Sequence, residues 1–251
     1  MARYAGDIGW LTQRPIAHRG YHDMNRDVWE NTLTAFERAV AQDFAIECDL
    51  QFACDGVPVV FHDEDLERLC GLRGDVRLQT SAELGMRRIG GGRDSIPSLK
   101  TALERVAGRV PMILELKGRG ARGEEISDDD GFAEAVLEVL EGYAGKVAVM
   151  SFNANILRDF IAADCPHPVG LTAEGTTPEQ FYEHEDAMDM GLDFLAYRVE
   201  HLPNPFVEGV QRLGLPVLSW TVRTEEMRAC SDAYAHQMTF EGFDPDQDPA
   251  E

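Results

Sequence analysis

The chain has 251 residues, of which 44% are hydrophobic and 27% are charged, as is typical of a globular protein. Its 45 acidic residues outnumber its 23 basic ones, and the formal net charge is −22. A charge of this sign repels phosphate backbones and argues against a nucleic-acid partner. No stretch approaches the ~20 uninterrupted apolar residues that a membrane-spanning helix needs.

Cysteine usage and the first residues bear on localisation. The five cysteines are odd in number and form no C-x-x-C pair, which favours reduced thiols. Residues 1–13 lack the basic and then apolar pattern of a signal peptide. We therefore expect a cytoplasmic protein without a membrane span.

Short apolar runs alternate with segments of helical periodicity along most of the chain. The predicted parallel strands cover residues 15–18, 45–52, 110–116, 147–152, 169–172, 194–198, 216–222 and 237–240. The predicted helices cover residues 31–42, 98–107, 131–143, 156–163, 178–190, 206–213 and 225–233.

One additional strand, at 57–61, breaks this alternation. It follows the second strand after only four residues, and a parallel crossover needs about a dozen. Asp55-Gly56 favours a hairpin, so the additional strand should run antiparallel. The eight remaining strands predict an α/β fold, a single (β/α)8 TIM barrel with a β-hairpin extension after strand 2. We expect one catalytic domain over 1–251, with 63–97 as a small insertion or lid and 241–251 as a loose acidic tail.

Acidic residues lie on the inward face predicted for the second strand. Glu47 and Asp49 share this face because side chains alternate along a strand. If Asp55-Gly56 formed a two-residue loop, Asp49 would lie opposite His62. Glu47, Asp49 and His62 should then converge, and the helix-facing side would carry Ile46, Cys48, Leu50 and Phe61.

Two carboxylates on a buried face are costly unless they are neutralised. One acid alone could equally be a salt-bridged core residue, but two at i and i+2 with a histidine opposite favour a divalent cation. Oxygen ligands favour Mg²⁺ or Ca²⁺ over Zn²⁺. Glu115 ends the apolar run 111–114 and is expected to be a third ligand. Lys117, one of only three lysines in the chain, is expected to bind an anion held by the cation rather than to form a surface ion pair.

His18 ends the first predicted strand, and Arg19 follows it. A lone histidine at a strand end is usually structural, and a lone arginine is usually a surface charge. In a barrel, however, the carboxyl ends of all strands meet on one rim, which carries the chemistry. Two histidines beside a bound anion can supply a general base and a general acid, and an arginine can grip phosphate oxygens with its fork.

Several motifs occur in a fixed order: Ile16-Ala17-His18-Arg19-Gly20, Glu30-Asn31-Thr32, Glu47-Cys48-Asp49, the segment 55–63, Glu115-Leu116-Lys117, Ser151-Phe152 and Trp220-Thr221-Val222. Together they resemble the glycerophosphodiester phosphodiesterase family of the PI-phospholipase-C-like barrel superfamily. The resemblance covers residues 15 to about 230.

This resemblance implies hydrolysis of a small glycerophosphodiester to glycerol 3-phosphate and an alcohol, as part of lipid and glycerol metabolism. It implies one divalent cation, Mg²⁺ or Ca²⁺, at the positions of Glu47, Asp49 and Glu115. His18 and His62 would be the acid–base pair, in an order that the sequence leaves open. The substrate would be contacted by Arg19, Lys117, Glu30, Phe152 and Trp220. Glu30 could equally cap a helix, and Phe152 could pack in the core.

Two segments depart from the family pattern. The loop 21–29 is longer than usual, and we expect its His22 to be exposed. The last strand reads Gln237-Met238-Thr239-Phe240-Glu241-Gly242 in place of a Gly-Ile-Ile-Thr-Asp type, which puts the alcohol-side contacts in doubt.

Three other functions stay open: a lysophospholipid-directed phosphodiesterase, a non-catalytic phosphodiester or metal-binding barrel, and an Mg²⁺-dependent enolising enzyme. The charge of −22 disfavours approach to anionic bilayers, and a non-catalytic binder needs no acid–base pair. An enolising enzyme would make less use of a second histidine and of Arg19. The head-group alcohol and the oligomeric state are not determined by the sequence.

Overall fold

The computed structural model describes residues 3–118, 129 and 131–247. Its eight parallel strands are β1 (Ile16–Ala17), β2 (Ala45–Phe52), β4 (Met112–Leu116), β5 (Val147–Ser151), β6 (Val169–Ala173), β7 (Phe194–Arg198), β8 (Val217–Val222) and β9 (Gln237–Phe240). Strand β1 pairs with both β2 and β9, which closes the sheet. The predicted (β/α)8 barrel is therefore confirmed.

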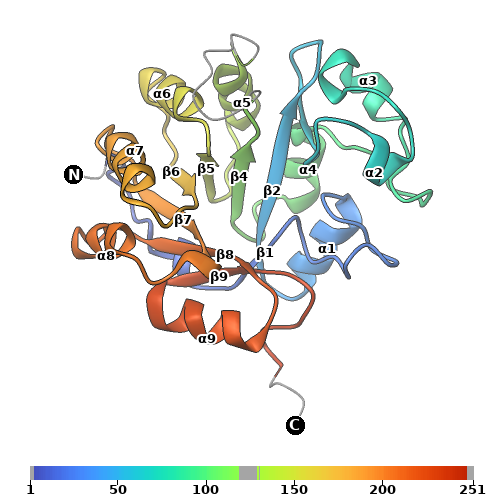
Figure 1. Cartoon of the computed structure of the whole chain (residues 1–251). Helices are drawn as coiled ribbons and strands as arrows, with labels where there is room; N and C mark the ends of the chain where they lie inside the picture. The colour runs from blue at the N-terminus through green and yellow to red at the C-terminus, as the bar shows by residue number, and fades with distance from the viewer. Residues whose placement is uncertain (1–2, 119–128, 130, 248–251) are drawn as a thin grey trace.

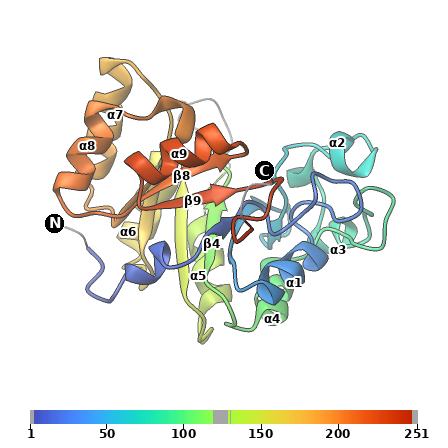
Figure 2. The ribbon, with the colours of Figure 1, turned by 90° about the horizontal axis from the view of Figure 1, so that it is seen from below.

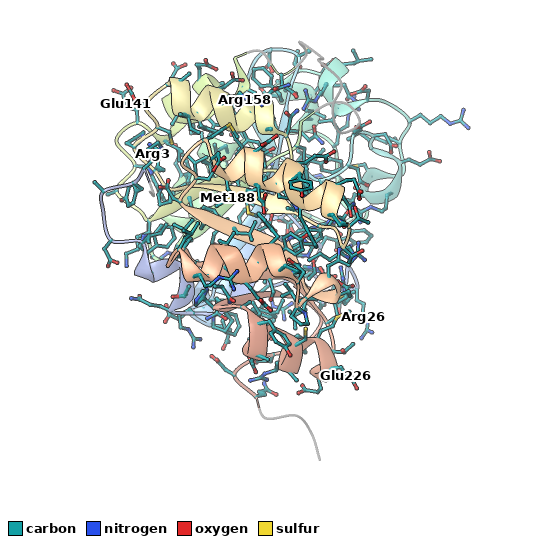
Figure 3. The ribbon with its side chains drawn as sticks, turned by 60° about the vertical axis from the view of Figure 1, so that its left-hand side comes forward. Arg3, Arg26, Glu141, Arg158, Met188 and Glu226 are labelled. Carbon is teal, nitrogen blue, oxygen red and sulfur yellow. The ribbon has the colours of Figure 1, made fainter. Side chains whose placement is uncertain are left out.

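In the described part of the chain, seven helices surround the strands (Figure 1). They are α1 (Leu33–Ala41), α4 (Leu99–Val106), α5 (Phe132–Leu140), α6 (Ala154–Ala162), α7 (Pro178–Met188), α8 (Pro205–Arg212) and α9 (Glu225–Tyr234). Six of them begin after a Ser, Thr or Asn whose side chain accepts a hydrogen bond from a first-turn amide. Charged side chains such as Glu141, Arg158 and Glu226 project from the outer surface (Figure 3). Among the described residues, none of the helices has the length and apolar character needed to cross a membrane.

The period-2 alternation of the strands separates two hydrophobic cores. One fills the barrel and includes Ala45 and Ile113, which share their strand faces with Glu47 and Glu115. The other lies between the strands and the helices and includes Cys48. The acids therefore stand on the inner face, above the apolar filling of the barrel.

The β2–β3 hairpin has a register that differs by one residue from our prediction. Strand β3 (Pro58–Val60) is antiparallel to β2, but Asp49 lies opposite Phe61, whose amide donates to the Asp49 carbonyl at 3.0 Å. The reason is the loop. A two-residue type I′ turn needs positive φ at both Asp55 and Gly56, and only Gly56 has it, at +76°. Three residues therefore form the loop, closed by the Ala53 amide and the Val57 carbonyl.

The shifted register also moves Phe61 away from the helix-facing core. Phe61 packs instead with Leu66, Leu69 and other residues of a third apolar cluster, most of which lie in the segment 61–98. This segment includes the expected insertion or lid at 63–97, and it contains α2 (Glu67–Cys70), the 3-10 helix η2 (Val76–Leu78) and α3 (Ser81–Leu84). It forms a lobe beside β2, on the opposite side of the barrel from α7 and α8 (Figures 1 and 2).

The segment after β9 differs from the loose tail that we expected. Glu241 is buried, and the ring of Phe243 packs against that of Phe240. The last part of the expected tail, 248–251, lies outside the described residues. The chain after the barrel thus begins as an ordered segment against the rim.

Candidate active site

Three acids gather at the carboxyl end of the barrel strands. Glu47 and Asp49 come from β2 and Glu115 from β4, and the strand register places Asp49 directly beside Glu115. One carboxylate oxygen of each lies within 4.8 Å of the others, and all three residues are buried. The structure thus brings together the three residues that we expected as cation ligands.

These acids are incompletely neutralised by the protein. Burial, together with the charges of Asp49 and Glu115, raises the pKa of Glu47 well above its usual value. In the described part of the chain no hydrogen-bond donor reaches Glu47 Oε1, although the atom is buried. A buried oxygen without a donor is costly. The cluster therefore has the composition and the need for positive charge that suit a hard divalent cation.

Two cationic side chains contact the same acids. Lys117 Nζ lies 2.9 Å from Asp49 Oδ1 and also contacts Glu115. Arg19 Nε lies 3.3 Å from Asp49 Oδ2. Although burial opposes ionisation of Asp49, the charges of Lys117, His62 and Arg19 hold its pKa well below the usual value. Lys117 is thus a half-buried partner of two buried acids, not part of a surface ion pair.

His18 follows β1 and points along the rim towards Glu47. Its Nε2 is 4.0 Å from Glu47 Oε2, and its Nδ1 is 2.5 Å from Glu241 Oε2. Burial lowers the pKa of His18, partly offset by the hydrogen bond to Glu241. The ring is thus held by a carboxylate on one nitrogen and has its other nitrogen near the acid cluster.

His62 reaches the site from beyond β3, in spite of the shifted register. The side-chain amide of Gln51 donates to the backbone carbonyls of His62 and Asp63 at 3.1 and 3.2 Å, which fixes the bend of the chain there. The His62 ring is 2.7 Å from Asp63 Oδ1, and Arg68 donates to both oxygens of that carboxylate. His62, like His18, is therefore held by an ionised acid that is paired with an arginine.

A cavity of about 300 Å³ joins these groups. Its lining includes both histidines, Glu47, Glu115, Arg19 and Lys117. Phe152 and Trp220 belong to the apolar part of the wall, with their rings edge to face at 5.5 Å between centroids. Phe152 thus lines the cavity, and its contact with a substrate stays a prediction.

Glu30 is placed differently from its expected contact with the substrate. It is absent from the cavity lining among the described residues and lies behind Arg19, which donates to it at 2.5 Å. It does not cap α1 either, because Thr32 accepts the first-turn hydrogen bond. Although burial disfavours its charge, hydrogen bonds from Arg68 and the charge of Arg19 lower the pKa of Glu30 to about 2.

Sequence reasoning missed residues that support the site from behind, one beside the acid Asp49 and others beside His18. Asn31 donates to Asp49 Oδ2 at 2.8 Å and is fully buried. His22, expected to be exposed, is buried with Nε2 3.4 Å from Glu241 Oε2. The sequence did contain a signal for Glu241. It directly follows the last barrel strand, at the carboxyl end where barrel enzymes place their active sites.

A closed barrel whose rim joins clustered acids, two histidines and a cavity defines a TIM-barrel enzyme. The chain matches the sequence model of the Glycerophosphoryl diester phosphodiesterase family over residues 18–244, and it belongs to this family.

Similar proteins cover nearly the whole chain. A glycerophosphodiester phosphodiesterase of Caldanaerobacter subterraneus subsp. tengcongensis is 29% identical over 231 residues, which are 84% of this chain and 87% of that protein. A phosphodiesterase of Oleispira antarctica, solved in complex with the product sn-glycerol-3-phosphate, has a TM-score of 0.79 at 23% identity, covering 92% and 94% of the two chains. A glycerophosphodiester phosphodiesterase of Thermotoga maritima has a TM-score of 0.71 at 24% identity, covering 91% and 94%.

Proposed function

We propose that this protein hydrolyses glycerophosphodiesters to glycerol 3-phosphate and an alcohol, using one divalent cation and the two histidines. The observation that carries the proposal is the cavity itself, which joins His18 and His62 to a cluster of three acids with an orphaned Glu47 oxygen. The family membership and the product-bound Oleispira phosphodiesterase support the same substrate class.

Glu47, Asp49 and Glu115 are the residues that would hold the cation, Mg²⁺ or Ca²⁺. When bound, the cation supplies positive charge for a phosphate oxygen and stabilises the charge that develops during displacement. The non-bridging oxygens would also face Arg19 and Lys117, which line the cavity.

The charge of the cavity suits an anionic substrate in an acidic protein. Among the described residues its lining has four cationic side chains, Arg19, Lys117, Arg198 and Arg223, and three acids, Glu47, Glu115 and Glu200. The lining itself is therefore cationic by one charge, but Asp49 and Glu241 pair with Arg19, Lys117 and Arg223 from behind it. A bound cation would supply the further positive charge that lets a phosphodiester approach in a chain that carries −22.

In the first step one histidine takes the proton of the glycerol 2-hydroxyl, whose oxygen bonds to phosphorus as the bond to the alcohol oxygen breaks. The other histidine gives its proton to the departing alcohol. In the second step water attacks the cyclic phosphate, the second histidine takes a proton from the water, and the first returns its proton to the 2-oxygen. Each histidine thus ends in its starting protonation state.

The test is product analysis with the purified full chain. Glycerophosphocholine, glycerophosphoethanolamine and glycerophosphoglycerol would each be incubated with Mg²⁺, with Ca²⁺ or with a chelator. We expect glycerol 3-phosphate from at least one diester with a cation and none with the chelator. A lysophospholipid would be assayed in parallel. Its hydrolysis without that of the three diesters would assign the lipid-directed function, and binding without turnover would assign a non-catalytic one.

A further inference from the structure

Arg77 connects the lobe of residues 61–98 to the rim of the barrel. It lies in the short 3-10 helix η2, yet only 6% of its side chain is exposed. Burying a guanidinium is costly unless its charge and its N–H groups find partners. The partners of Arg77 therefore show what the buried charge does.

The guanidinium of Arg77 donates to three separate parts of the chain. Nη1 donates to Asp129 Oδ1 at 2.5 Å, Nη2 donates to the backbone carbonyl of Lys117, and Nε donates to Gln51 Oε1 at 3.3 Å. The Asp129 carboxylate neutralises the buried charge. The other two acceptors are neutral groups, and both belong to residues next to the candidate active site.

The first of these acceptors belongs to the backbone of Lys117. The Lys117 amide donates to the Leu50 carbonyl at 3.0 Å, and the Lys117 carbonyl accepts from Arg77. Both sides of this residue are therefore held, which fixes the direction in which its side chain leaves the end of β4. That direction leads to Asp49 and Glu115.

The second acceptor is the side chain of Gln51, which is 1% exposed. Its oxygen accepts from Arg77, and its nitrogen donates to the backbone carbonyls of His62 and Asp63. A guanidinium can only donate and a carbonyl can only accept, so both contacts require the same orientation of the amide. Arg77 thus holds the side chain that fixes the bend of the chain at His62.

Lys117 and His62 both line the cavity, whereas Arg77 is not among the described residues of its lining. Arg77 can therefore affect a substrate only through its neighbours. The planar fork of an arginine has a fixed geometry, so one rigid group sets the positions of both neighbours together.

We propose that Arg77 is a positioning residue, which holds Lys117 directly and His62 through Gln51 and so gives the lobe a part in catalysis. This inference rests on the proposed function. It assigns a role to the segment 63–97, for which the sequence predicts only an insertion or lid.

The first test is Arg77→Lys. Lysine keeps the positive charge beside Asp129, but a single ammonium group cannot replace a fork that reaches three acceptors. We expect kcat/KM to fall by about 10–100-fold, with KM raised through Lys117 and kcat lowered through His62. Steady-state kinetics on the diester that the wild type hydrolyses measures both constants. Unchanged kcat and KM would overturn the proposal.

Gln51→Met separates the two arms of the network. Methionine has a similar volume but cannot hold the His62 and Asp63 carbonyls, while the contact between Arg77 and the Lys117 carbonyl is kept. We expect a lower kcat with KM changed by less than about 3-fold. This variant also tests the arm to His62 if Arg77→Lys does not fold, and an unchanged kcat would exclude that arm.

A double variant tests whether the effect on KM passes through Lys117. If it does, Lys117→Met/Arg77→Lys should have the same KM as Lys117→Met alone. A further rise in KM by the full factor seen for Arg77→Lys would contradict the proposal. Carbon-13 NMR of the labelled Lys117 carbonyl gives a readout independent of turnover, and Arg77→Lys should shift this signal.

Arg3 provides a matched control at the opposite end of the barrel. Its guanidinium donates to the backbone carbonyls of Cys165 and His167 at 2.5 and 2.7 Å and pairs with Asp193 at 3.3 Å. These partners precede β6 and β7, away from the carboxyl ends of the strands. Arg3→Lys should lower the melting temperature without changing kcat or KM.

The control also separates the possible failures. If Arg3→Lys lowered kcat/KM as much as Arg77→Lys does, the effect would be a general loss of stability and the proposal would fail. If the wild type hydrolyses no diester, the proposed function fails. An active wild type with an equally active Arg77→Lys variant refutes only the present inference.

Discussion

The Arg19 backbone amide donates a hydrogen bond to Glu47 Oε2 at 2.9 Å. Arg19 has φ of +57°, and Gly20 after it has φ of +79° with no room for a Cβ, which would lie 2.8 Å from the Phe36 ring. This tight turn ties the end of β1 to the acid cluster on β2. It places His18 and Arg19 on the same cavity wall.

The two histidines are expected to contribute to turnover and not to cation binding. His18→Ala and His62→Ala should each lower kcat by about 10²–10⁴-fold, the usual contribution of a general acid or base. Both variants should keep the rise in melting temperature that Mg²⁺ or Ca²⁺ produces in the wild type. Steady-state kinetics and thermal unfolding provide the two measurements. Near-normal turnover in both variants would refute the assignment.

Removal of the cation should destabilise the wild type through the crowded acids. Saturating cation is expected to raise the melting temperature by about 5–10 °C relative to chelator. Glu47→Gln relieves the repulsion from Asp49 and Glu115, so in chelator it should melt at or above the wild-type temperature. It should also lose both activity and the cation-induced shift. A variant that still responds to the cation would exclude Glu47 as a ligand.

Asn31 is expected to orient Asp49 for cation binding. Asn31→Ala removes the donor to Asp49 Oδ2, and loss of such a supporting partner typically weakens metal affinity by about 10–100-fold. Thr32→Ala is the matched control, because it removes the cap of α1 and should cost about 1 kcal/mol of stability without changing affinity. Calorimetric titration with Mg²⁺ or Ca²⁺ compares the two. Equal affinities in both variants would assign Asn31 a purely structural role.

Glu30 should make stability depend on pH in the acid range. Its folded pKa of about 2 lies below the ordinary value of 4.5, so its stabilising effect is present above pH 4.5 and is lost as the pH falls towards 2. The wild type should therefore lose about 2 kcal/mol more than Glu30→Gln over this interval. Denaturant unfolding at a series of pH values measures the difference. Parallel pH profiles would show that Arg19 and Arg68 do not depend on the Glu30 charge.

Local chain patterns were sufficient for the barrel and for the acid cluster. Alternation along β2 puts Glu47 and Asp49 on one face, and the carboxyl-end position of Glu115 puts it on the same rim. These relationships involve neighbouring positions on a strand or the common direction of parallel strands, so they need no knowledge of side-chain packing.

The hairpin register and the contacts of Glu241 required the tertiary structure. Asp55-Gly56 is compatible with loops of two or three residues, and the choice depends on the backbone angles there and on where Phe61 packs. His22 and Glu241 are 219 positions apart, and they meet because β9 pairs with β1 when the barrel closes. Contacts between the two ends of a chain are set by the closure of the whole sheet, and no local pattern encodes them.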